Sequence, residues 1–272
     1  MAVGALSRGL GVLQCLVGSP DGLPLARIAE VVDLPKSAVH RILVTLVDEG
    51  FVRRVDSSGQ YVLTLRIVSL GLRHLAGSTI FELAIPVLSA LANESGQLVR
   101  LGLVDGEQLL WVAKSQGAKS GLRYDPDPGS EIPYASTASG VAWLSRLSDD
   151  EALSRVARQK PVERHLLGHN APTTLAEVQS RIQEARAKGW AQVHDSFEEG
   201  ISAMAAPLFD PGSGKPLGVV SIAGPSLQLS GTRMEELAPS LLNTAAELSG
   251  LAGLAWQAGR DQLTPRRTGA RP

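Results

Sequence analysis

Cysteine, long apolar runs and net charge are all scarce in this sequence. The single cysteine, Cys15, excludes disulfides within the chain, and its position on the apolar face of a predicted helix indicates a core thiol rather than a nucleophile. No apolar run has the length of a membrane span, and the first residues lack the layout of a signal peptide. We therefore expect a cytoplasmic protein with no membrane partner.

Enzyme signatures are missing as well. The sequence has no Gly-x-Ser-x-Gly nucleophile elbow and no phosphate-cradling glycine loop. His165, His169 and His194 with Asp195 could be imagined as a metal site, but they lack the close spacing on one helix that zinc sites commonly show. We therefore predict no enzymatic activity, no catalytic residues, no bound metal and no cofactor.

Charge is unevenly distributed, although the net value for all 272 residues is only −1. Residues 1–77 carry +2, residues 78–257 carry −6 and residues 258–272 carry +3. With 44% apolar and 19% charged residues, the composition is that of a soluble globular protein, long enough for two domains. Phosphate binding would be local to the N-terminal domain, and its small positive charge favours two copies acting together.

The first helices are predicted from apolar residues at helical spacing. A helix over residues 6–17 is expected to place Leu6, Leu10, Leu13 and Val17 on one face. A helix over residues 25–32 follows, and Asp33-Leu34-Pro35 ends it because proline disfavours helix in the residue before it. The next helix starts at Lys36 or Ser37 and ends near Gly50, with positions 39, 42, 43 and 46 turned inward.

Residues 51–63 have the pattern of a β-hairpin. Two short runs of strand-forming residues, 51–55 and 60–63, flank the turn Asp56-Ser57-Ser58-Gly59. Two helices separated by a tight turn and followed by a hairpin make a winged helix-turn-helix, which is a DNA-binding motif.

The predicted DNA contacts are polar side chains left on the outside of this motif. Long donors on the N-terminal half of the second helix reach base edges in a major groove, and a helix N-terminus suits a phosphate. Arginines of the hairpin are placed for the backbone or a minor groove, and the arginine near the start of the first helix either touches phosphate or is solvated. The candidates are Lys36, Ser37, His40, Arg41, Arg53, Arg54 and Arg8. The alternative is an ordinary solvated face.

From residue 78 onward the pattern is mixed α/β, after a helix over residues 65–75 that acts as a linker or as a dimer seam. The predicted helices span 81–91, 137–147, a segment opened by the capping box Ser148–Glu151, 174–189, and a long stretch that ends before Gly259. The predicted strands span 97–104, 108–114, 121–125, 190–194, 202–209 and 216–224. The domains are therefore expected at 1–64 (winged helix-turn-helix), 65–78 (linker helix) and 79–257 (effector binding and oligomerisation), with a disordered tail at 258–272.

Six segments carry a resemblance to a known family. They are LPKSAVHRIL (34–43), YVLTLR (61–66), IPYASTASG (132–140), KGW (188–190), GISAMAAP (200–207) and SIAGP (221–225). In this order, over about residues 6–256, they make the chain similar to IclR-type transcriptional regulators. The resemblance implies an α/β (α+β) fold class, with an N-terminal winged helix-turn-helix and a C-terminal, GAF/PAS-like effector-binding domain whose sheet is mostly antiparallel.

The resemblance also implies the partners. It indicates a homodimer or tetramer that binds a palindromic double-stranded DNA operator and responds to a small-molecule effector, commonly an organic or aromatic acid. Whether such a protein represses or activates depends on operator position, which the chain does not encode. The competing hypothesis is a small-molecule sensor or enzyme whose N-terminal module is a protein-interaction domain, and the charge on that module argues against it.

Effector contacts are carried over by position from the family. Residues 137–139 match a segment whose backbone N–H groups, at a helix start, hold a ligand carboxylate. Positions 203, 221 and 223 match small or hydroxyl-bearing pocket residues on strands, and positions 194 and 195 match a region where acidic residues are common. The candidates are Thr137, Ala138, Ser139, His194, Asp195, Ala203, Ser221 and Ala223.

Two departures from the family pattern bear on the ligand. His194 stands near a position where the family commonly has a carboxylate, and Ala223 replaces a serine that is frequent in the family. Together they imply a pocket with fewer hydroxyls and a less polar ligand. The alternative is that Ser221 and Ala223 merely pack in a sheet and that His194 is a surface residue.

Overall fold

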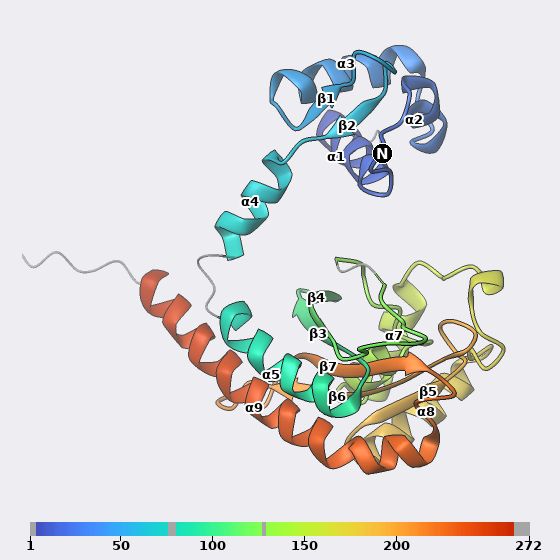
Figure 1. Cartoon of the computed structure of the whole chain (residues 1–272), viewed down its shortest axis with the longest axis vertical. Coiled ribbons are helices and arrows are strands. Elements are labelled where there is room, and N and C mark those ends of the chain that lie inside the picture. Colours follow the sequence, from blue (N-terminus) through green and yellow to red (C-terminus); the bar gives the residue numbers. More distant parts are fainter. Residues whose placement is uncertain (1–3, 76–79, 127–128, 264–272) are drawn as a thin grey trace, which may run out of the picture. The chain divides into compact units, whose positions relative to one another are not determined.

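The computed structural model describes residues 4–75, 80–126 and 129–263, and the chain divides into two compact units, residues 1–77 and 78–272 (Figure 1). Within the described residues, no helix combines the length and the apolar character that crossing a membrane requires.

The N-terminal unit consists of short helices and a two-stranded antiparallel sheet. Its elements are α1 (Ala5–Val17), α2 (Leu25–Val31), α3 (Lys36–Asp48), β1 (Val52–Arg54), β2 (Tyr61–Leu63) and α4 (Arg66–Leu75). Strand β1 pairs with β2, and Leu23 bridges to Tyr61 on the other side of β2. The predicted winged helix-turn-helix is confirmed.

The turn between α2 and α3 forms as the sequence predicts. Asp33 adopts a positive φ of 51°, which aspartate tolerates better than most residues. The backbone N–H of Leu34 then donates to the carbonyl of Ala29, and α3 begins directly after Pro35. Helix α3 buries Val39 and Leu43 completely and half-buries positions 42 and 46, so its inward face is confirmed.

The apolar face predicted for α1 is not the face that packs most deeply. Val12 and Leu16 are buried in the core and Leu13 of the predicted face packs partly buried against it, whereas Leu6, Leu10 and Val17 are 78%, 51% and 64% exposed. Both sets follow helical spacing, so periodicity alone does not choose between them. Packing of α1 against α3 and β2 makes that choice, and it leaves an apolar stripe of α1 uncovered.

The C-terminal unit is built on one antiparallel sheet with strand order β4-β3-β7-β6-β5. Its strands are β3 (Leu98–Asp105), β4 (Gln108–Gln116), β5 (Ala191–His194), β6 (Ile201–Phe209) and β7 (Pro216–Pro225). Its helices are α5 (Ile80–Ser95), α6 (Ala138–Leu144), α7 (Asp149–Arg158), α8 (Leu175–Lys188) and α9 (Gly231–Leu263), with a 3-10 turn at Arg164–Leu166. The mixed helix-and-sheet fold class with a C-terminal antiparallel sheet is confirmed.

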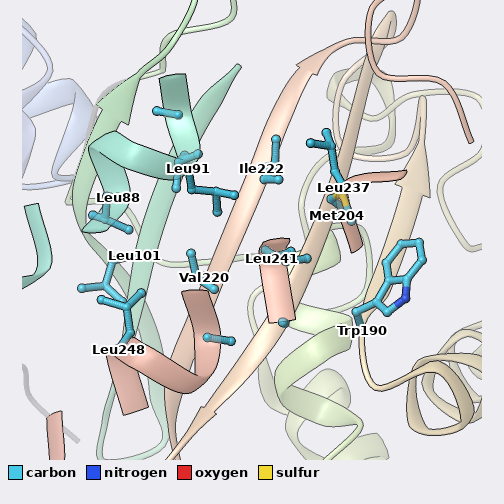
Figure 2. Packing of buried hydrophobic residues seen from close by; sticks show 14 of the residues in the cluster. Leu88, Leu91, Leu101, Trp190, Met204, Val220, Ile222, Leu237, Leu241 and Leu248 are labelled. Atoms are coloured by element: carbon cyan, nitrogen blue, oxygen red, sulfur yellow. The ribbon is translucent and has the colours of Figure 1, made fainter. Parts of the chain in front are cut away.

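Each face of the sheet is covered by helices, and side chains alternate between the two faces along each strand. Helices α5 and α9 pack on one face, as Figure 2 shows for a cluster that includes Leu88, Leu91, Leu101, Trp190, Met204, Val220, Ile222, Leu237, Leu241 and Leu248. Helices α6 and α8 belong to the opposite core, which includes Trp111, Tyr134, Val141, Trp143, Ile182, Val193, Ala205 and Val219. The two cores therefore share the strands between them.

Local signals place the helix starts accurately. The hydroxyl of Ser148 accepts from the backbone N–H of Glu151 at the start of α7, and that of Thr174 accepts from Glu177 at the start of α8. Helix α8 ends at Gly189, whose φ is 81°. The predicted cap at Ser148 and the predicted bounds of the helix over residues 174–189 are confirmed.

One predicted strand is absent, and several predicted helix boundaries differ from the structure; the helix predicted over residues 137–147, for example, ends at Leu144. Residues 121–125 form no strand; the edge of β4 is occupied instead by residues 129–132, where Ile132 N–H donates to the carbonyl of Leu109. Helix α9 continues to Leu263, past its predicted end at Gly259. The rest of the predicted tail, residues 264–272, lies outside the described residues.

Candidate functional site

The exposed side of α3 carries the predicted base-reading residues together. Lys36, Ser37, His40 and Arg41 are all exposed, while Val39 between them is fully buried. No side chain caps the start of α3, so its first backbone N–H groups remain available to a phosphate. The structure therefore brings these four residues onto one surface.

One residue on this surface was missed by sequence reasoning. Val44 lies one turn beyond Arg41 and is 47% exposed, although the apolar pattern gave no reason to single it out. An apolar side chain in a major groove can contact a thymine methyl group. Val44 therefore joins the candidate contacts of α3.

The hairpin presents its two arginines on opposite sides. Arg53 pairs with Val62 and Arg54 with Tyr61 in the β1–β2 register, and both arginines are exposed. Consecutive residues of a strand point to opposite faces. The two guanidinium groups therefore point away from each other on the two faces of the hairpin.

None of the basic residues of α3 and the hairpin is neutralised within the part of the chain that the structure describes. Lys36, Arg41, Arg53 and Arg54 take part in no ion pair there, whereas Arg27 on α2 pairs with Glu30 at 2.8 Å. Exposed cations without an ion-pair partner are suited to phosphates.

Arg8 lies apart from this row. It is half-buried in α1 and lines a hollow of about 580 Å³ with Gln14, Cys15 and the turn residues 31–34. Its Nε is buried without a hydrogen-bond partner. Burial also raises the pKa of the Cys15 thiol, although Arg27 opposes the shift, so this thiol is a weaker nucleophile than a free cysteine.

Three strand positions of the predicted effector site share the sheet face that α6 covers. Ala203 pairs with Ala223, and Ser221 pairs with Ala205, so these residues form one small-residue patch on β6 and β7. Helix α6 packs on both strands. Its N-cap Thr137 accepts from the N–H of Gly140, and Ala138 and Ser139 are buried at its start.

His194 and Asp195 are not brought to this patch. His194 pairs with Ser202 at the end of β5, and their side chains lie on the α9 face of the sheet. Asp195 has a positive φ of 46°, and its carboxylate accepts from the hydroxyl of Ser226 and the N–H of Gly200. The sequence prediction erred because alternation along β5 directs Val193, not His194, toward α6.

Sequence reasoning missed Arg100 and Trp111. Arg100 lies in the middle of β3, is 6% exposed, and faces Ser221 of β7 in the strand register. Its guanidinium carbon stands 3.7 Å from the ring centroid of Trp111 on β4 and 5.9 Å from that of Tyr124. A charged residue inside an otherwise apolar strand was the available signal, but its face was unknown before the register was seen.

Burial dominates the electrostatics of this site. It lowers the pKa of Arg100 to about 10, against the opposing effects of Tyr124 and Glu198, so the guanidinium remains charged near neutral pH. Burial also raises the pKa of Tyr124 to about 12, so its phenol remains neutral. The site thus holds a cation among aromatic rings, and it is suited to an anion.

Metal ligands do not gather in the described part of the chain. No three histidine, cysteine, aspartate or glutamate side chains there are grouped as a metal site. Nδ1 of His169 lies 2.8 Å from the Glu199 carboxylate, and both side chains are exposed.

A helix that presents unpaired cations, carried on the same chain as a separate sheet domain, is the arrangement of a DNA-binding transcriptional regulator. Residues 5–56 match the IclR helix-turn-helix domain, and residues 73–250 match the family described as "Bacterial transcriptional regulator IclR C-terminal". The chain belongs to the IclR family of transcriptional regulators. Because these domains and relatives are regulators, the expectation that the chain is not an enzyme is confirmed.

Individual relatives are similar to this chain over nearly its whole length. The acetate operon repressor of Salmonella typhimurium is 25% identical over 249 residues, which cover 91% of this chain and 89% of the repressor. An IclR transcriptional regulator from Alicyclobacillus acidocaldarius has a TM-score of 0.78 at 25% identity, covering 93% of this chain and all of the other. An IclR homologue from Microbacterium hydrocarbonoxydans, complexed with 4-hydroxybenzoate, has a TM-score of 0.73 at 19% identity, covering 91% of this chain and 98% of the homologue, and shares the fold.

Proposed function

We propose that this chain binds a palindromic operator as a dimer or a pair of dimers, and that a small organic or aromatic acid bound in the C-terminal unit modulates operator affinity. The observation that carries the DNA-binding half is the exposed, unpaired row of Lys36, Ser37, His40 and Arg41 at the uncapped start of α3. These side chains read bases in the major groove, while Arg53 and Arg54 hold the wing on the duplex. Arg8 is a further candidate for a phosphate contact.

Two copies are favoured by the charge and by uncovered apolar surface. Residues 1–77 carry only +2, which is little for tight binding by one copy. The stripe Leu6, Leu10 and Val17 on α1 is exposed, as are Leu65, Val68, Leu70 and Leu72 at and along α4. Contiguous exposed apolar side chains are typical of protein contact sites. Contacts between copies along these helices place two recognition helices on the two half-sites of a palindrome.

The effector half rests on the patch under α6. Ala203, Ser221 and Ala223 place small side chains on the sheet face that α6 covers, and the proposed ligand lies between them and the start of α6, where Thr137, Ala138 and Ser139 meet its polar group. The same fold holds 4-hydroxybenzoate in the Microbacterium homologue, which supports an aromatic or organic acid as the ligand class. Binding there biases the geometry of the two copies and so the spacing of the recognition helices.

The test is selection from sheared genomic DNA by the full-length protein, followed by mobility shifts over a salt titration. Enrichment of one or a few palindromic fragments, with affinity that falls steeply as salt rises, is the expected result. The matched control is Arg233→Ala, which removes an exposed arginine of α9 and is expected to change neither the fragments nor the salt slope. A folded protein that enriches no fragment at low salt contradicts the proposal.

A further inference from the structure

Three buried polar atoms that lack a hydrogen-bond partner belong to side chains on three neighbouring strands of the C-terminal sheet. Within the described residues, the buried side-chain atoms that lack a hydrogen-bond partner are Arg8 Nε, Arg100 Nε, Trp111 Nε1, Trp143 Nε1 and Ser221 Oγ. Folded proteins satisfy nearly all such atoms, so each exception requires an explanation. Arg100, Trp111 and Ser221 come from β3, β4 and β7, which are neighbours in the sheet.

The strand register places these three side chains on one face. Arg100 is the partner of Ser221 across β3 and β7, and Gly102, two residues further along β3, is the partner of Trp111 on β4. Trp111 belongs to the core under α6, and so does Val219, which precedes Ser221 by two residues. The three groups therefore lie on the α6 face, together with the small residues of the proposed effector site.

Arg100 carries a charge that nothing in the described structure neutralises. It forms no ion pair; Glu198, the acidic group that acts on it electrostatically, is exposed and not within ion-pair distance. Its other strand partner, Lys114, is a second cation, and that lysine is already engaged by Asp125 at 2.8 Å. An unpaired buried charge is costly, and folded proteins rarely keep one without a use.

The chemistry of the three groups defines what completes them. The guanidinium N–H and the indole N–H can only donate, and the serine hydroxyl can donate as well, so the missing partner is an acceptor. The Trp111 ring lies against the guanidinium, which leaves the guanidinium edge for a ligand. A planar carboxylate matches that edge with two parallel hydrogen bonds.

We propose that Arg100 is the anion receptor of the C-terminal unit, binding the carboxylate of a small organic acid at the guanidinium edge, with Ser221 Oγ and Trp111 Nε1 donating to the same ligand. The inference rests on the proposed effector site and deepens it. Neither Arg100 nor Trp111 is among the positions carried over from the family. It assigns the ligand's negative charge to the β3 side of the site and makes Arg100 a specificity-determining residue.

The first experiment needs no ligand. Arg100→Met keeps the length of the side chain and removes the uncompensated charge, so the ligand-free, full-length variant is expected to unfold about 2–4 °C higher than the wild type. A purely structural arginine, held by its contacts with aromatic rings, predicts the opposite. The control is Arg146→Met, which removes an exposed arginine 4.8 Å from the ring centroid of Phe209 and is expected to give no increase. A lower unfolding temperature for Arg100→Met overturns the proposal.

The second experiment uses defined probes. Acetate, pyruvate, succinate, benzoate and 4-hydroxybenzoate are compared with acetamide and benzamide for their effect on the unfolding temperature, and binding is then measured by calorimetry. At least one carboxylate is expected to stabilise the wild type, whereas acetamide and benzamide are not. Arg100→Met is expected to lose at least about tenfold in affinity for that acid. Arg100→Lys keeps the charge but loses the two-pronged geometry, and it is expected to bind the acid more weakly than the wild type.

The outcomes separate this inference from the proposed function. If no carboxylate of the set stabilises the wild type, if an amide stabilises it equally, or if Arg100→Met binds the acid like the wild type, Arg100 is not an anion receptor. Specific operator binding in the genomic selection would then still stand. If operator binding fails while Arg100 binds the acid, the receptor stands and the regulatory function falls.

Discussion

The imidazole of His194 donates from Nδ1 to the hydroxyl oxygen of Ser202, 3.0 Å away, on the face of the sheet opposite to Ser221. The direction follows from counting protons. The Ser226 hydroxyl donates its proton to the Asp195 carboxylate at 2.9 Å, so it accepts from the Ser202 hydroxyl, also at 2.9 Å. The single proton of Ser202 is then used, and the hydrogen bond between Ser202 and His194 takes its proton from the imidazole. This row of hydrogen bonds connects the end of β5 to the start of β6 and the end of β7, which is a structural role.

Removing the buried Ser202 hydroxyl from this row of hydrogen bonds should destabilise the C-terminal unit. Ser202 is fully buried, and Ser202→Ala leaves the ring of His194 and the hydroxyl of Ser226 without their shared partner. We expect a loss of about 1–3 kcal/mol in the free energy of unfolding, measured by chemical denaturation. Ser154→Ala, which removes an exposed hydroxyl on α7, should change it by less than about 0.5 kcal/mol. Equal stability of the two variants would show that this row of hydrogen bonds contributes nothing to the free energy of unfolding.

Arg41→Ala should weaken and relax operator recognition. A guanidinium that reads a base contributes about 1–3 kcal/mol, so affinity for the selected operator should fall by that amount and discrimination at one base position should be lost. Quantitative mobility shifts on the operator and its single-base variants measure both quantities. Unchanged affinity with unchanged preference removes Arg41 from the set of base-reading residues.

Arg54→Ala should behave differently, because the wing is proposed to contact the duplex backbone. Affinity should fall by a similar factor for the operator and for unrelated DNA, and the slope of log affinity against log salt should decrease by about 1. A salt titration with both DNAs tests this directly. A loss confined to the operator would instead assign Arg54 to base reading.

Ser221→Leu should abolish the effector response without changing DNA binding. The larger leucine side chain occupies the place proposed for the ligand between β7 and α6, and the substitution removes the hydroxyl that faces Arg100. With an acid that shifts operator affinity of the wild type, the variant should bind the operator normally and ignore the acid. Ser213→Leu in the exposed β6–β7 loop is the control and should respond like the wild type. A preserved response in Ser221→Leu places the effector elsewhere.

Acid should weaken the attachment of α7 to α8. Arg186, and after it Gln179, hydrogen-bond to the Asp149 carboxylate and hold its pKa below the usual range. A carboxyl whose pKa is lower in the folded state stabilises the protein above the unfolded-state pKa, and that contribution is lost as pH falls through the folded-state pKa. The unfolding temperature of the wild type should therefore fall once the pH is below about 4. The unfolding temperature of Asp149→Asn should be lower than that of the wild type at neutral pH and should fall less on acidification. Parallel pH profiles for the two proteins would contradict this role.

Sequence reasoning succeeded where one short segment contains all the determinants of its structure. The turn at Asp33-Leu34-Pro35 ends α2 and starts α3, and the caps at Ser148 and Thr174 start α7 and α8, through contacts within four residues. The exposed row of α3 follows from the same local periodicity. These features needed no knowledge of distant parts of the chain.

It failed where two local solutions were equally good. Helix α1 has two apolar stripes, and only packing against α3 and β2 buries Val12 and Leu16 rather than Leu6 and Leu10. The edge of β4 accepted residues 129–132 although residues 121–125 also had strand character. In both cases the outcome depends on which distant surface is available, and periodicity contains no information about that.

The sequence by itself determined the winged helix-turn-helix, the alternation of helices and strands after it, and the basic character of its outer surface. Only the tertiary structure decided which side of the sheet each strand residue faces. A shift of one residue in strand register moves every side chain to the opposite face, and the register is set by partners far away in the chain. That is why His194 lies away from the proposed effector site, and why Arg100, whose face no local pattern could assign, lies beside Ser221.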